Sequence, residues 1–309
     1  MAESNIQTIT FNDVSGLSSQ VMFLQLRAGL LGNSRKMGGD IFNTPGTDVA
    51  WLSANKKLLE SPQLDAIRKA DMRIRQWLYN SKGPALPCSF DAFTIPNGSV
   101  VSVRNKLEEF KTERAGLVDE FMAVYVEQSR EAREKLGPQW NPHEYLTPER
   151  VRAKFYFEYS FYGFGVSETL KEISQELYDE QKNKIESDFR NAADEITAVM
   201  RETAFGLLQN LQEQLTPDDT TGKAKKLHPA ALANVKNFLE SFSIKNVTND
   251  NELSNILAQV KTLVTGVDTK TIKASESFKT NMRDKLAEIT GKLSTMVEEK
   301  SGRKFLFDE

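Results

Sequence analysis

The stretch Phe155-Tyr156-Phe157-Glu158-Tyr159-Ser160-Phe161-Tyr162-Gly163-Phe164-Gly165 decides how the chain is interpreted, because it places seven aromatic residues between two long helical patterns. At a period of two, residues 155, 157, 159 and 161 share one face, which predicts a β-strand with one buried side. A helix is disfavoured because two glycines end the run and bulky rings would crowd every face. We therefore predict that residues 155–162 form the central strand of a small sheet.

The aromatic run has an alternative use, because rings in a row can stack on nucleic-acid bases. Such a platform needs basic residues between the rings, and here only Glu158 interrupts them. The pattern therefore favours a core strand. The apolar residues 21–30 predict a strand that pairs with it, and the short extended piece 88–94, which lies between Pro87 and the Ile95-Pro96-Asn97-Gly98 turn, predicts a third.

Two long helices flank the aromatic strand in the sequence. Apolar residues recur every three or four positions over residues 100–136, where Gly137-Pro138 ends the pattern, and over residues 167–215, where Ser167 is placed to cap the helix. Arg114 and Gln181 interrupt these seams with polar groups. We predict that the two seams pack together as a long antiparallel helical hairpin, in which Gln181 meets a polar group of residues 100–136. A homodimeric coiled coil is the competing use.

The fold class that follows is mainly α with a small β-sheet (α+β): a coiled-coil-like helical hairpin plus a C-terminal helical domain. Residues 1–99 are predicted to hold the N-terminal strand and helices, the latter at 47–59 and 61–79. The hairpin, with its aromatic strand 155–162, covers residues 100–215. Residues 216–228 read as a linker by composition, and residues 229–309 as the C-terminal helical domain.

Composition excludes several classes of protein. A net charge of −3 and a pI near 5.7 argue against a chain that binds polyanions over its whole surface. The lone cysteine, Cys88, excludes an internal disulfide framework and indicates a reducing compartment. No apolar run is long enough to span a bilayer, and residues 1–20 lack the pattern of a secretory signal. We expect a cytoplasmic protein that does not bind membranes.

No combination of residues in the sequence indicates an enzymatic reaction. Two histidines and one cysteine do not make a metal site of any usual spacing, and neither a dinucleotide fingerprint nor a phosphate loop occurs. We predict no catalytic, metal or cofactor-binding residues, and no enzyme. The one candidate contact site is the basic cluster Lys223, Lys225, Lys226 and His228, which could touch phosphates or an acidic partner. A solvated linker is the alternative.

Three segments together resemble a known family. They are Val21-Met22-Phe23-Leu24-Gln25-Leu26, the proline turn at Ile95-Pro96, and Val151-Arg152-Ala153-Lys154-Phe155-Tyr156-Phe157. The pattern, over residues 17–215, resembles an uncharacterised family of bacterial, plasmid and phage proteins, a domain of unknown function that carries no catalytic motif. That family is often encoded beside a MoxR-type AAA+ ATPase and a protein with a von Willebrand factor A domain. The resemblance implies a helper or client of an ATP-driven remodelling complex.

Two functions from different classes remain as predictions. The first is a non-enzymatic helical adaptor or client of a MoxR-type AAA+ ATPase and von Willebrand factor A system on a phage or mobile element. The second is a nucleic-acid-binding accessory protein that acts through the C-terminal domain, where residues 223–309 carry a local charge of +4. The partner, the process and the oligomeric state, homo-oligomer included, stay open.

Overall fold

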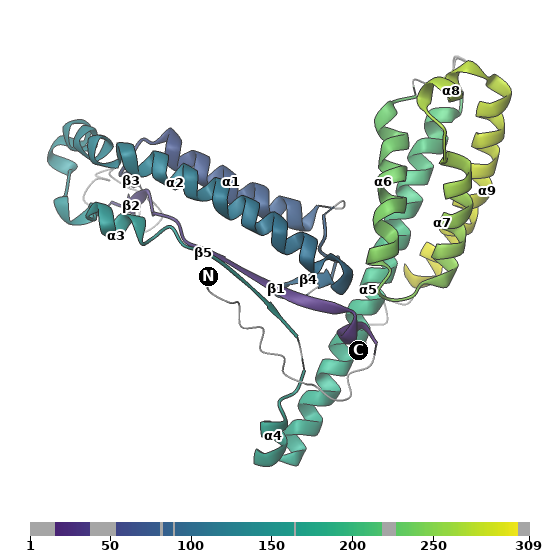
Figure 1. Cartoon of the computed structure of the whole chain (residues 1–309), viewed down its shortest axis with the longest axis horizontal. Helices are drawn as coiled ribbons and strands as arrows, with labels where there is room; N and C mark the ends of the chain where they lie inside the picture. The colour runs from purple at the N-terminus through teal and green to yellow at the C-terminus, as the bar shows by residue number, and fades with distance from the viewer. Residues whose placement is uncertain are drawn as a thin grey trace, which may run out of the picture. The chain divides into compact units, whose positions relative to one another are not determined.

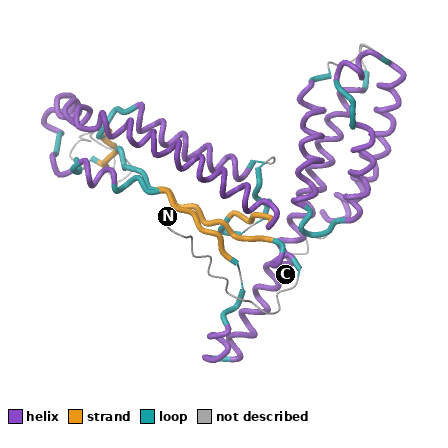
Figure 2. Tube along the Cα trace, viewed as in Figure 1, coloured by secondary structure: helices purple, strands orange, loops and turns teal. Residues whose placement is uncertain are grey.

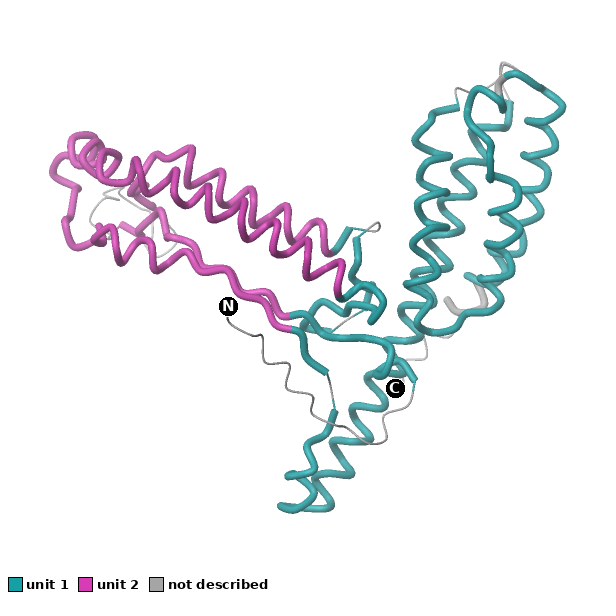
Figure 3. The backbone as a smooth tube through the Cα atoms, in the orientation of Figure 1, with its two compact units in different colours: residues 1–24, 79–100, 161–309 teal, residues 25–78, 101–160 magenta. Residues whose placement is uncertain are grey.

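The computed structural model describes residues 16–37, 54–80, 83–88, 90–163, 165–217 and 227–301. Helices dominate, and two small antiparallel sheets accompany them (Figures 1 and 2), so the predicted mainly α class with a small sheet is confirmed. The chain divides into two compact units (Figure 3): residues 25–78 and 101–160 form unit 2, and residues 1–24, 79–100 and 161–309 form unit 1. No described helix is long and apolar enough to cross a membrane.

The three-stranded sheet has the order β4-β1-β5, with β1 at Val21–Ala28, β4 at Phe93–Pro96 and β5 at Phe157–Tyr162. Strand β1 pairs antiparallel with β4, from Val21 opposite Pro96 to Leu24 opposite Phe93. The predicted neighbours β1 and β5 are confirmed, but the prediction that the aromatic strand is central is wrong. Strand β1 takes the centre because it is the more apolar one, and β5 alternates along one edge with Phe157 buried and Glu158 exposed.

Unit 2 is built on an antiparallel helix pair, α1 at Pro62–Tyr79 and α2 at Val100–Leu136. Their contacts run in opposite order along the two helices, from Gln63 with Gln128, through Asp71 with Arg114, to Trp77 with Phe110. The helix α2 begins and ends at the predicted residues. It ends at Leu136 because Gly137, at a φ of 49°, stops it. The apolar seam of α2 therefore packs on α1. The sequence pattern had instead predicted that this seam would pair with the second long helix, at residues 167–215.

The remaining elements of unit 2 are a two-stranded ribbon and three short helices. Residues 34–36 (β2) and 55–57 (β3) form a two-stranded antiparallel ribbon. The short helices η5 (Gly137–Gln139), η6 (Pro142–Glu144) and α3 (Pro148–Arg152) follow α2. The helix predicted at 47–59 is wrong in its described part, which is strand β3, because the polar residues 55–57 pair with β2 while Leu58 and Leu59 enter the core. Residues 47–53 of that prediction lie outside the described residues.

Unit 1 contains a helical bundle of α5 (Gln175–Leu215), α6 (Pro229–Lys245), α7 (Asn251–Val264) and α9 (Glu276–Ser301), with α8 (Thr269–Ala274) between the last two (Figure 1). Its core is continuous along α5 from Phe189 to Leu215 and includes Val235, Val260 and Leu286 from the other helices. The predicted C-terminal helices are therefore present, and they cover the second half of the long seam. Apolar burial is non-directional, so either seam is satisfied by any neighbouring apolar face.

The second long helix is broken near its start. The segment α4 (Glu168–Ile173) has Ser167 as its cap, as predicted, and the chain then turns at Ser174 before α5 begins. Ser174 has extended backbone angles, and its hydroxyl accepts a hydrogen bond from the Leu177 amide, so it ends one helix and caps the next. The α4 segment folds back on α5, with the Tyr178 hydroxyl donating to Glu168 at 3.3 Å (Figure 1).

Candidate functional site

The basic cluster predicted at the linker is only partly described. Lys223, Lys225 and Lys226 lie outside the described residues. His228 is exposed at the N-cap position of α6, makes no side-chain cap, and donates its backbone N–H to Gln214 Oε1 at 2.9 Å. The described residues therefore do not test whether the four residues form a site, and the prediction of an anion or partner contact here stays a prediction.

Several cations of the C-terminal helices are used within the fold. Lys279, Arg283 and Lys292 pair with Glu276, Asp284 and Glu288 on the same helix. Lys236 donates to the Val267 carbonyl at 2.6 Å. Lys245 is buried, and this burial lowers its pKa. These contacts reduce the cationic surface available to a phosphate backbone on this part of unit 1.

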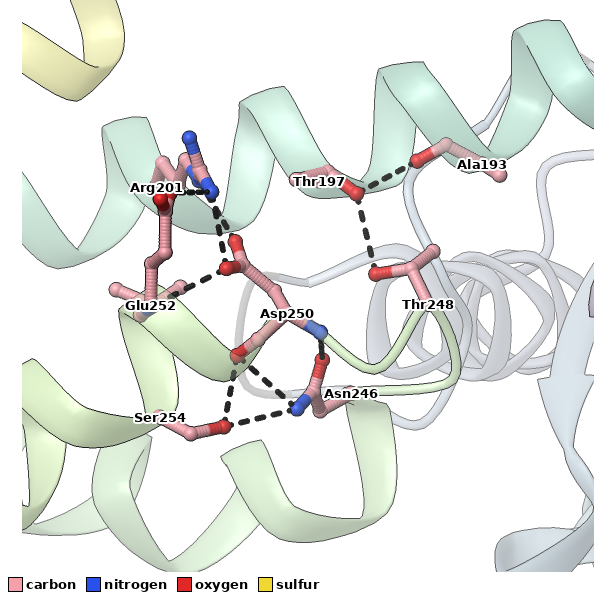
Figure 4. Close-up of polar contacts among 9 residues, drawn as sticks. Ala193, Thr197, Arg201, Asn246, Thr248, Asp250, Glu252 and Ser254 are labelled. Carbon is pink, nitrogen blue, oxygen red and sulfur yellow. Dashed lines mark hydrogen bonds and ion pairs between the residues drawn. The ribbon is translucent and has the colours of Figure 1, made fainter.

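A polar network joins α5 to the turn between α6 and α7 (Figure 4). The Asp250 carboxylate accepts from Arg201 Nε at 2.6 Å and Nη2 at 2.9 Å, and from the Leu253 amide at the start of α7. Arg201 Nη2 also pairs with Glu252 at 2.9 Å. The hydrogen bond to Asp250 is the main cause that raises the pKa of Arg201. The carboxylate thus serves as a helix cap and as the acceptor of a bidentate arginine pair.

The other groups of this network also serve the turn. Asn246 accepts from the Asp250 amide at 2.8 Å and donates to Ser254 Oγ at 3.1 Å. Thr197 on α5 donates to Thr248 Oγ1 at 3.1 Å (Figure 4). Each residue labelled in Figure 4 makes at least one of these contacts, so we interpret the network as the clasp that holds the α6–α7 turn on α5.

Unit 2 has its own buried ion pair. Arg114 is 2% exposed; its Nε donates to Asp71 Oδ1 at 2.6 Å and its Nη2 to the Gly29 carbonyl at 2.5 Å. The guanidinium also lies 5.9 Å from the centre of the Phe157 ring. The polar interruption of the α2 seam is thus a structural bridge that ties α2 to α1 and to the end of β1. The sequence marked Arg114 as unusual but did not show its partner.

Cys88 is not arranged as a nucleophile. Its Sγ lies 3.1 Å from Thr94 Oγ1 on β4. Burial is the main cause that raises the pKa of the Cys88 thiol, which favours the neutral thiol over the nucleophilic thiolate. Among the described residues, no group of three His, Cys, Asp or Glu side chains could hold a metal ion. Comparison with protein-family models, curated proteins and solved structures found no match.

The feature that sequence analysis missed is an apolar surface at the α4–α5 junction. The seam predicted as buried runs through Ile173 and Leu177, yet these side chains are 73% and 46% exposed. The same seam is buried from Phe189 onward. Residues 168–180 carry five acids and a single lysine, Lys171, so the apolar pair is flanked in the sequence by negative charge. The signal was present in the spacing, but spacing alone does not distinguish a covered from an uncovered seam.

Proposed function

We propose that this protein is a non-enzymatic helical adaptor, and that the junction of α4 and α5 is its binding surface. The observation that carries the proposal is the exposed continuation of a seam that is otherwise core. Large exposed aliphatic side chains on either side of the Ser174 turn, flanked in the sequence by acids, fit a partner that presents an apolar patch flanked by basic residues.

The partner that we propose is the MoxR-type AAA+ ATPase, with its von Willebrand factor A protein, that the family resemblance implies. A client or helper of such a complex needs an accessible recognition surface and no catalytic residues of its own. The acidic and apolar junction meets that need. The two apolar anchors lie on either side of the Ser174 turn, Ile173 at the end of α4 and Leu177 in the first turn of α5, so the partner would contact the junction of two helices and not one helical stripe.

Co-purification of the full-length protein with these two partners tests the proposal. The double variant Ile173→Glu with Leu177→Glu removes both apolar anchors, and we expect it to abolish the association without unfolding the chain, because both side chains are exposed. The matched control is Val101→Glu with Val126→Glu, two valines of α2 that are 67% and 65% exposed. No association of the wild-type chain, or equal association of both double variants, would refute the proposed surface.

A further inference from the structure

A second surface, in unit 2, has the opposite character. The ribbon of β2 and β3 consists of Ser34-Arg35-Lys36 paired with Asn55-Lys56-Lys57, which places four cations and no acid on six residues. Five of the six residues are exposed, and Lys56 is the exception. One structural explanation of this composition is that charges on short strands prevent edge-to-edge pairing. The lysines of the ribbon differ in their contacts, however, and this difference indicates a role beyond the prevention of edge pairing.

The two faces of the ribbon differ. Residues directly opposite each other in an antiparallel pair point to the same face. The register sets Arg35 opposite Lys56, and it therefore gathers Ser34, Lys36, Asn55 and Lys57 on the other face. Lys56 Nζ is committed to the protein, since it donates to the Gln139 carbonyl at 2.7 Å and pairs with Glu144 at 2.6 Å. One lysine thus anchors the ribbon while the opposite face is left to solvent.

The base of the ribbon is held as firmly. Asn33 is buried, donates its side-chain amide to the Leu59 carbonyl at 2.8 Å, and accepts from the Leu59 amide at 2.8 Å. Leu58 and Leu59 belong to the core of unit 2. The ribbon is consequently preorganised, so that binding through its outer face would cost little additional ordering.

The charges of the outer face are weakly neutralised. Among the described residues, no carboxylate pairs with Lys36. Lys57 meets Glu60 at 3.6 Å, and Glu60 is shared with Lys135 at 3.5 Å, with all three side chains well exposed. Such exposed pairs contribute little and are readily exchanged for another anion.

We propose that the outer face of the β2–β3 ribbon binds the phosphate backbone of a double-stranded nucleic acid, with the ribbon lying in the major groove. Lys36 and Lys57 supply the charge, and Ser34 and Asn55 supply short hydrogen-bonding groups of the kind that contact phosphate and sugar. The major groove of B-DNA admits a two-stranded β-ribbon. An anionic membrane fits less well, because the ribbon strands carry no apolar side chain to insert. This inference is independent of the proposed adaptor surface.

The test is fluorescence anisotropy of the full-length protein with a labelled 20-bp DNA duplex, between 50 and 200 mM salt. Lys36→Gln with Lys57→Gln is compared with Lys69→Gln with Lys111→Gln, which removes the same charge from exposed positions on α1 and α2 of the same unit. We expect the ribbon variant to reduce the slope of log K against log salt by about 1.8, at about 0.9 for each phosphate contact. We expect the control variant to keep the wild-type slope.

Three results would overturn the inference. The first is the absence of duplex binding by the wild-type chain at 50 mM salt. The second is an equal effect of the two lysine pairs, which would indicate unspecific attraction by the whole unit. The third is tighter binding of a 20-nucleotide single strand, or of vesicles with 30% phosphatidylserine, than of the duplex. Unchanged thermal unfolding of both variants shows that any loss of binding does not come from unfolding.

Discussion

Replacement of Arg114 by methionine tests whether the buried ion pair organises unit 2. The change leaves the Asp71 carboxylate, whose side chain is 18% exposed, and the Gly29 carbonyl without their donor. Removing one partner of a buried pair costs about 3–5 kcal/mol, since the remaining charge stays desolvated. We expect about 3 kcal/mol for Arg114→Met, because Asp71 keeps some contact with water. We expect about 4 kcal/mol for Asp71→Leu, which leaves the more deeply buried charge.

The double variant Arg114→Met with Asp71→Leu separates the pair from its packing. Both charges are then gone, and only the Gly29 carbonyl loses a hydrogen bond, which costs about 1 kcal/mol. We therefore expect the double variant to lie within about 1 kcal/mol of the wild type, far from the roughly 7 kcal/mol that additive single effects predict.

The assay is urea unfolding of the full-length protein by far-UV circular dichroism, with hydrogen exchange of the α2 amides as the local readout. The single variants should speed exchange around residue 114, and the double variant should restore protection. Additive losses in the double variant, or a loss below about 1 kcal/mol in Arg114→Met, would refute the view that the pair is a desolvated bridge.

Three further results are expected. Asp250→Ala removes the cap of α7 and the partner of Arg201, which should cost about 3 kcal/mol in urea unfolding and expose the α6–α7 turn to hydrogen exchange; unchanged exchange would contradict the clasp. Burial, and then the hydrogen bond to Glu108, raises the pKa of Tyr159 to about 12. The neutral phenol is thus favoured in the folded state, and its contribution to stability, present below pH 10, is lost as the pH rises from about 10 to 12. Ultraviolet titration should show the highest transition disappearing in Tyr159→Phe and moving down in Glu108→Gln. Because burial raises the pKa of the Cys88 thiol, iodoacetamide at pH 8 should modify it more slowly in the native protein than in urea, and equal rates would count against this explanation.

Local signals in the sequence determined the elements whose limits are local. Helix α2 ends at Leu136 because a glycine follows it, and Gly137-Pro138 can be read from the sequence as a helix stop; the structure gives this glycine a positive φ. Strand β5 alternates as its period of two requires. The first-turn proline of α1 and the capping hydroxyl of Ser167 act within a few residues of their own positions, so these two helix starts can also be predicted from the sequence.

Only the tertiary structure decided which apolar helix face packs against which other element. Apolar seams look alike in sequence, since burial has no direction, so the chain did not reveal that α2 packs on α1 while α5 packs within its own bundle. Ser174 could be read as helical until its hydroxyl was seen to cap the next helix. The candidate surfaces depend on the same distinction: Leu177 belongs to a seam by spacing, and Lys56 and Lys57 are neighbours of equal charge. They differ in what each side chain contacts: Lys56 pairs with Glu144, which lies far away in the chain, whereas Lys57 meets the exposed Glu60.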